Sequence, residues 1–229
     1  MQNIYIKELF RIKIGKFEWI ISETHLGIII IMMLLIGFSY YINRKLKHFE
    51  DVPKGIQNFV ELVVETFNKF TVSTMGEKGR KFAAYFATLF IFILVSNISG
   101  VFNLRPPTAD YAVPFGLAII TFFMVQFYGI KEKGVGAYLK GFTQPLWPMT
   151  PINVIGEISN PISLSFRLFG NIIGGTILMA LYYSQLPWIA QIGIPSAFHF
   201  YFDLFAGVLQ AFVFTMLSMV FVSGAIEVD

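Results

Sequence analysis

Five apolar runs dominate this chain, and each is long enough to cross a lipid bilayer. They cover residues 26–42, 82–102, 111–130, 152–183 and 196–226. A membrane helix needs about 20 mostly apolar residues, and a helix is the structure in which a single segment satisfies its own backbone polar groups. The runs therefore predict an all-α polytopic membrane protein with about five membrane-spanning helices.

The last two runs are longer than a perpendicular span requires, since each exceeds thirty residues and about 20 are enough. We expect both helices to be strongly tilted, kinked, or extended past the bilayer. Pro161 is a candidate for a bend in the first of them. The short connection at 184–195 makes the two helices neighbours in the chain, so they predict a long antiparallel hairpin.

The spans divide the chain into segments. We expect an N-terminal outer segment at 1–25, a first span at 26–42, a basic loop with an interfacial helix at 43–81, two spans within 82–130, an inner loop at 131–151 and the helical hairpin at 152–229. In 53–69 the apolar residues recur at helical spacing, which is typical of an amphipathic helix lying on the membrane surface. A short helix that faces water is an equally good interpretation.

The basic residues predict the orientation of the spans. The loops at 43–81 and 131–140 hold eleven Lys and Arg residues, against five in the N-terminal segment and at Arg105. Cytoplasmic loops carry the excess of Lys and Arg. The N-terminus is therefore expected outside and the C-terminus in the cytoplasm.

Composition excludes several classes of function. The net charge of only +3 makes nucleic acid a poor candidate partner, and the absence of cysteine excludes disulfides and thiolate metal sites. The three histidines are scattered without metal-ligand spacing, and neither a Walker A loop nor a Gly-x-Ser-x-Gly elbow occurs. We expect no cofactor, no metal and no catalytic activity of the chain on its own.

Arg167 is the single Lys or Arg between residues 141 and 229, and it lies inside the fourth apolar run. Placing a guanidinium at the centre of a membrane helix costs roughly 2.5–3.5 kcal/mol on insertion scales. Arginine also keeps its proton in proteins, so it is a poor proton carrier and a good fixed charge. We expect this charge to be used. The alternative is a structural salt bridge to Asp203 or Glu157, although both acids lie at other depths.

Polar and small residues share the helical face of Arg167: Asn160, Ser163, Asn171 and Gly174. Ser163 and Asn171 lie one turn to either side and are close enough to hydrogen-bond the guanidinium. Gly170 and Gly174 have the spacing that allows two helices to approach closely. Without the arginine, such a face would favour helix packing over ion conduction.

The last apolar run also has one helical face of polar and small residues, formed by Ser196, His199, Asp203, Gly207 and Gln210. Asp203 is a second ionisable group at membrane depth, which is a functional hypothesis by default. His199 lies near the start of the helix and is more typical of an interfacial residue.

Depth along the two antiparallel helices can be counted from their connection. Arg167 and Gln210 lie roughly 21–24 Å from it, whereas Asp203 and Thr176 lie about 10 Å from it. Glu157 lies on the other side of Arg167 and is either part of the path or a capped carboxylate. The order of acid, cation and acid suits an ion path interrupted by a fixed charge, and it argues against a continuous cation pore.

The string Arg167-Leu-Phe-Gly-Asn171, preceded by Asn160-Pro-Ile-Ser-Leu-Ser-Phe166, closely resembles the hallmark of subunit a of F-type ATP synthases. Residues 209–217 resemble the last helix of that family, and residues 53–61 and 96–100 add support. The resemblance covers nearly the whole chain beyond Leu26.

This resemblance implies an ion-translocating stator subunit of the membrane motor Fo. Arg167 would match the essential arginine between two offset half-channels, Gln210 the glutamine that faces it, and Asn171 the asparagine one turn later. The implied partners are a ring of c subunits with mid-membrane carboxylates, the b subunits of the peripheral stalk, other ATP synthase subunits and the lipid bilayer. The implied location is the bacterial plasma (inner) membrane, and the ion is either H⁺ or Na⁺.

One position departs from the family pattern. Many relatives carry an acidic residue or histidine at the position of Thr176, paired with an ionisable residue on the next helix. Here Thr176 is neutral, so Asp203 alone is expected to titrate in the outer half-channel. A stand-alone secondary transporter or channel is a second hypothesis, although we find no inverted repeat, and a structural membrane scaffold is a third.

Overall fold

The computed structural model describes residues 8–14, 17–45, 54–102, 104–144, 146–185, 198 and 200–226. Within these residues, five helical segments are long and apolar enough to cross a membrane: Glu23–Lys45, Glu77–Phe102, Ala112–Lys133, Trp147–Gln185 and Phe200–Ile226. Each matches one apolar run of the sequence, with ends displaced by a few residues. The predicted all-α polytopic fold is confirmed.

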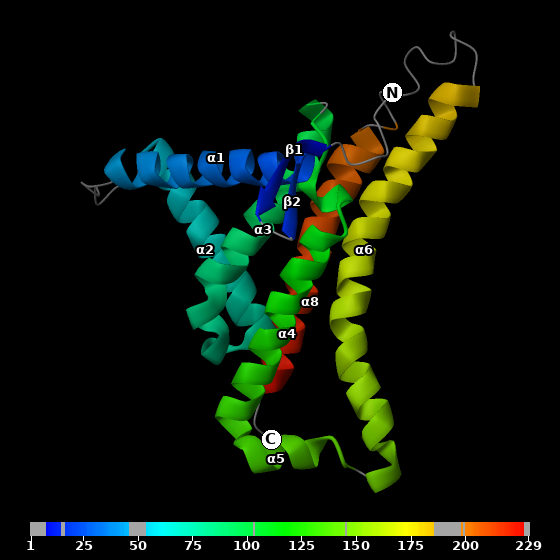
Figure 1. Cartoon of the computed structure of the whole chain (residues 1–229). Coiled ribbons are helices and arrows are strands. Elements are labelled where there is room, and N and C mark those ends of the chain that lie inside the picture. The colour runs from blue at the N-terminus through cyan, green and yellow to red at the C-terminus, as the bar shows by residue number, and fades with distance from the viewer. Residues whose placement is uncertain are drawn as a thin grey trace.

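The helices are α1 (Glu23–Lys45), α2 (Ile56–Met75), α3 (Ala83–Ile98), α4 (Ala112–Lys133), α5 (Val135–Gly141), α6 (Thr150–Gln185) and α8 (Ala206–Ile226). Figure 1 shows α3, α4, α6 and α8 side by side, with α6 and α8 running in opposite directions as expected. The 36-residue α6 contains Pro161 and continues through it. It bends along its length in Figure 1, as a proline that removes one helical hydrogen bond favours.

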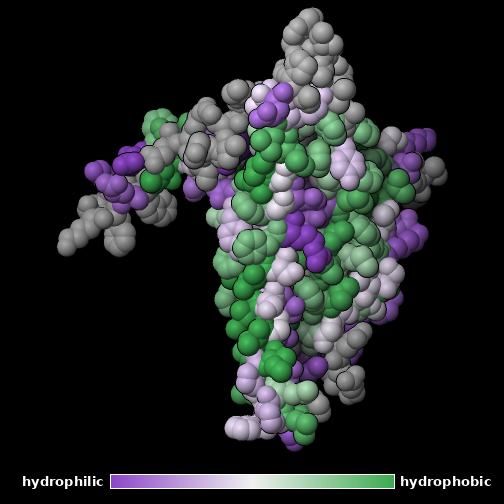
Figure 2. Space-filling view, turned by 90° about the vertical axis from the view of Figure 1, so that its right-hand side faces the viewer, coloured by the Kyte–Doolittle hydropathy of each residue, from purple (hydrophilic) through white to green (hydrophobic). Residues whose placement is uncertain are grey.

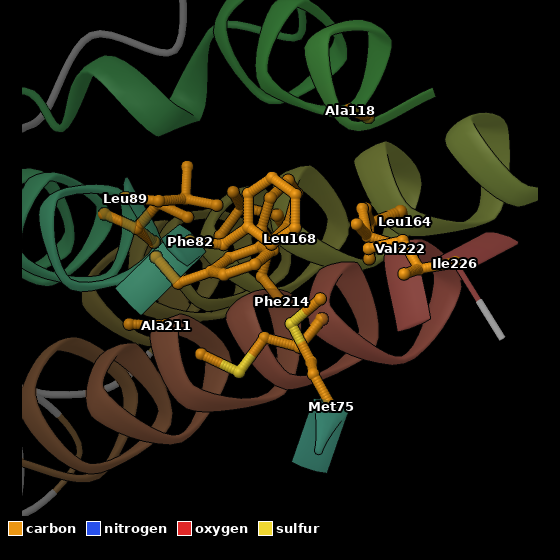
Figure 3. Packing of buried hydrophobic residues seen from close by; sticks show 13 residues of the cluster. Met75, Phe82, Leu89, Ala118, Leu164, Leu168, Ala211, Phe214, Val222 and Ile226 are labelled. Atoms are coloured by element: carbon orange, nitrogen blue, oxygen red, sulfur yellow. The ribbon is translucent and has the colours of Figure 1, made fainter. Parts of the chain in front are cut away.

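The core lies where α3, α4, α6 and α8 meet. Phe86, Ile93, Leu168 and Phe214 are fully buried there. Figure 3 shows Leu168 of α6 and Phe214 of α8 converging with Phe82, which ends the short 3-10 helix Glu77–Phe82 before α3. Lipid tails are as apolar as these side chains, so the gain comes from close packing rather than from leaving water. This packing holds α6 and α8 at a fixed distance and register.

Helix α1 runs across the direction of α3, α4 and α6 in Figure 1. A bilayer has one normal, so α1 and these helices cannot all stand parallel to it. These helices therefore meet the membrane normal at different angles, and the strong tilt expected for the long helices remains a prediction.

Helix α2 confirms the helix predicted from the amphipathic pattern and extends it to Met75. It packs against α3 and α8, while Phe59, Leu62 and Val64 stay exposed. Lys69 lies 2.7 Å from Glu65, and its hydrogen bond and positive charge lower the pKa of the Glu65 carboxyl. The membrane-surface position of α2 remains a prediction.

A two-stranded antiparallel sheet precedes α1 and was not predicted. Strand β1 (Glu8–Ile14) pairs with β2 (Phe17–Ser22). Nζ of the cross-strand neighbour Lys13 lies 2.8 Å from Oε1 of Glu18, and Nη1 of Arg11 lies 3.5 Å from Oε2 of the same carboxylate. The sheet adds to the predicted fold class and does not change the number of candidate spans.

Candidate functional site

Arg167 lies near the middle of α6 with its side chain exposed. Among the described residues, its guanidinium makes neither a hydrogen bond nor an ion pair, so the expected bonds to Ser163 and Asn171 and the alternative bridge to Glu157 do not form. The side chain of Asp203 lies outside the described residues. Figure 2 looks onto the α6 side of the molecule, where a hydrophilic patch lies at mid-height between hydrophobic surfaces.

Asn171 makes its contact with α8 instead of with Arg167. Its Nδ2 donates a hydrogen bond of 3.4 Å to Oε1 of Gln210. Gln210 is only 5% exposed, and its Nε2 has no partner within the described part of the chain. Gln210 was expected at the depth of Arg167. Asn171, which it contacts, is four residues, or about 6 Å, beyond Arg167 along α6, so Gln210 lies within about one helical turn of that depth.

The Arg167 face of α6 is open in this chain. Ser163, Arg167 and Asn171 are exposed, and Asn160 and Gly174 are half-buried. No described helix fills the space at Gly170 and Gly174, because a Cβ at either would meet nothing within 4 Å, so the close approach that their spacing allows remains a prediction. The tight contact is one residue later, where a Cβ at Gly175 would lie 3.2 Å from Cβ of Phe202.

Glu157 faces a cavity of about 320 Å³ where α4, α5, α6 and α8 meet. Its polar lining consists of Lys133, Tyr138, Glu157 and Asn160. Nε2 of Gln126 donates to Oε2 of Glu157 at 3.4 Å, and the Tyr138 hydroxyl donates to Oε1 of Gln126. Burial raises the pKa of Tyr138, and the charge of Glu157 raises it further, against the effect of the bond to Gln126. The sequence analysis identified Glu157 and Asn160 but missed Gln126 and Tyr138.

The expected face of the last helix is only partly described. Ser196 and His199 lie outside the described residues, and so does the side chain of Asp203. The backbone of Phe200–Phe205 forms a π-helix, whose wider turn rotates the side chains that precede α8. A regular helical wheel is therefore wrong for this segment. The hydroxyl of Thr176 donates to the Ile172 carbonyl at 3.0 Å.

Asn97 fixes the start of α8 and was not predicted as a site residue. It is 1% exposed, and its Nδ2 donates to the Gly207 carbonyl at 2.9 Å. Thr108 donates to Oδ1 of Asn97 at 2.8 Å. A Cβ at Gly207 would lie 3.1 Å from Cβ of Asn97, so the glycine permits this contact. Asn97 thus holds α8 one turn before Gln210.

Comparisons with known proteins point to one family. The family model described as ATP synthase A chain matches residues 25–223, a range that includes Arg167, Asn171 and Gln210. ATP synthase subunit a of Trichlorobacter lovleyi is 37% identical over 202 residues, covering 86% of this chain and 84% of the relative. The protein of Moorella thermoacetica with the same name is 33% identical over 208 residues, covering 90% and 92%.

A third relative carries an ion in its name. "ATP synthase subunit a, sodium ion specific" of Propionigenium modestum is 33% identical over 228 residues, covering 93% of this chain and 76% of the relative.

Proposed function

This chain belongs to the subunit a family of ATP synthases. We propose that it transfers ions to a rotating ring of c subunits, and that Arg167 is the fixed positive charge at the point of transfer. Family membership makes it an ion-translocating membrane subunit of Fo, a partner of other ATP synthase subunits and not itself an enzyme. The observation that carries the proposal is the exposed guanidinium on α6, which lacks an ionic partner in the described part of the chain.

The proposed mechanism follows from the cost of charge in lipid. A ring carboxylate can face hydrocarbon only when it is neutral. Next to Arg167 the opposite charge favours the ionised form, so the carboxylate releases its ion there. It takes up another from the second half-channel before it returns to lipid. Arg167 also repels a cation that would pass directly between the half-channels.

The open face of α6 supports docking of the ring. Ser163, Arg167 and Asn171 are exposed in line, and Gly170 and Gly174 have free space over their Cα atoms. Small residues on a membrane helix let a second helix approach closely. We therefore assign this face to the c ring, and Gln210, joined to Asn171, supports it from α8.

The two half-channels are assigned to the two ends of this site. The cavity that Glu157 lines supports an inner half-channel, ten residues or about 15 Å along α6 from Arg167. Asp203 is proposed for the outer half-channel on the sequence alone. The N-terminus is placed outside and the C-terminus in the cytoplasm of a bacterial inner membrane, and b subunits are proposed as further partners.

The proposal is tested by ion uptake into vesicles that contain the whole complex. ATP should drive uptake of H⁺ or Na⁺, assayed separately, and a reagent that modifies the ring carboxylates should stop it. A stand-alone transporter predicts instead that this subunit moves ions in vesicles without the ring. The sodium-specific relative is the reason to assay both ions.

Asp203→Asn is expected to slow ion-driven ATP synthesis at least tenfold while the complex still assembles, because an amide cannot exchange a proton or hold a cation by charge. ATP synthesis in energised vesicles measures this effect. Glu132→Gln, which neutralises an exposed carboxylate at the end of α4, is the control and should change the rate little. An unchanged rate in Asp203→Asn would rule out its role in the outer half-channel.

A further inference from the structure

We propose that Tyr138 is a positioning residue, which holds Glu157 in place through Gln126 and so controls access of ions to the inner cavity. The inference rests on the proposed function and adds residues from α4 and α5 to it. The three side chains come from three elements, and the hydrogen bonds join them in one chain: Tyr138 to Gln126, and Gln126 to Glu157.

The two hydrogen bonds hold the Gln126 amide at both ends. The phenol of Tyr138 donates to Oε1, so Oε1 must face α5 and Nε2 must face α6. The carboxylate of Glu157 accepts from that Nε2. A carboxylate can only accept, so Glu157 itself selects the Nε2 end of the amide, and the phenol holds the opposite, oxygen end. Without the phenol the amide keeps only its bond to Glu157, and nothing described here holds its oxygen end in place.

Packing holds the Tyr138 ring independently of its hydroxyl. A Cβ at Gly129 would lie 2.7 Å from Cε2 of Tyr138, so the absence of a side chain there makes room for the ring. Phe142 packs edge-on against the same ring, with centroids 5.3 Å apart. Phenylalanine at position 138 would keep both contacts and lose only the hydrogen bond.

The titratable groups that line the cavity show which neighbour positions the Glu157 carboxylate. Lys133 from α4, Tyr138 from α5 and Glu157 from α6 are the titratable groups of the lining. The lining residues from α8 are Val220, Phe221, Gly224 and Ala225, none of which titrates. Within the described residues Lys133 and Glu157 form no ion pair, so the Gln126 amide, rather than the lysine, positions the carboxylate at the cavity wall.

The test is ATP-driven ion uptake by inverted membrane vesicles that contain the whole complex. In such vesicles the external solution (the bath) contacts the cytoplasmic side of the membrane, where the inner cavity is proposed to open. In Tyr138→Phe, the bath concentration of H⁺ or Na⁺ that gives half-maximal uptake should rise about three- to tenfold, as expected for the loss of one hydrogen bond between neutral groups. The maximal rate at saturating ion should stay within about twofold. Gln126→Leu should give the same change. Tyr128→Phe, which removes a phenol that has no hydrogen bond among the described residues, is the matched control.

A double-mutant cycle separates positioning from general structure. In a Glu157→Gln background, Tyr138→Phe should cause no further change, because the group that it positions has lost its charge. An equal change in both backgrounds, or no change in the single variant, would overturn the inference. Arg167→Ala in the same membranes reports on the proposed function separately, since full uptake in that variant would refute the function whatever Tyr138 does.

Discussion

Replacing Arg167 by alanine should abolish coupled transport in both directions while the complex still assembles. The guanidinium is exposed on α6 and has no ionic partner within the described chain, so its removal leaves no buried acid unpaired there. What is lost is the opposite charge that makes a ring carboxylate release its ion. The barrier to direct passage of cations is lost with it. ATP synthesis and ATP-driven ion uptake should both fall to the background of vesicles without the complex.

Arg167→Lys should also fail to support transport, although it keeps a cation. A lysine at membrane depth can lose its proton, and it lacks the planar group of donors that matches a carboxylate. Arg80→Ala is the control, because Arg80 is an exposed cation 3.7 Å from the exposed Glu77, and such pairs contribute little. Normal coupled rates in either Arg167 variant would contradict the assignment.

The second large effect is expected for Asn97→Leu, which should destabilise the subunit by about 2–4 kcal/mol. Leucine removes the donor to the Gly207 carbonyl and the acceptor for Thr108, both in buried positions. It also places a larger side chain where Gly207 already approaches Asn97 closely. The start of α8 should shift, and Gln210 with it. We expect less subunit in the assembled complex, its loss from the complex at a lower temperature, and slower ion uptake.

Ser96→Ala is the matched control for Asn97→Leu. Ser96 is the preceding residue of α3, is fully buried, and its hydroxyl has no partner among the described residues. Removing an unpaired buried hydroxyl should be neutral or slightly stabilising. If Asn97→Leu behaves like Ser96→Ala, Asn97 does not position α8.

The sequence was sufficient to predict the membrane fold, because long apolar runs leave the chain few alternatives. It also singled out Arg167, Asn171 and Gln210 as candidate site residues, and the last two meet across α6 and α8, while the roles of all three remain predictions. These residues stand out since polar groups are rare in apolar runs. The contacts of Arg167 were predicted incorrectly: helical spacing shows which side chains are near one another, but not whether a neighbour binds a different helix more favourably.

The features that were missed depend on tertiary contacts or on weaker signals. Phe10, Arg11, Ile12 and Lys13 alternate in polarity, and this period of two indicated the strand that was overlooked. Gln126 is a polar residue in the third apolar run and could have been recognised on the same grounds as Arg167. Tyr138 gives no such signal, since its role depends on where α5 folds relative to α4 and α6. The π-helix before α8 likewise has no simple sequence pattern.

The most direct test of the central claim is a structure of the intact complex at a resolution that shows side chains. We predict that the guanidinium of Arg167 lies in the membrane opposite a carboxylate of a neighbouring c subunit, with polar paths reaching it from the two sides. An Arg167 that forms its ion pair with Glu157 or Asp203 of its own chain, or that faces bulk water away from any ring, would contradict the account.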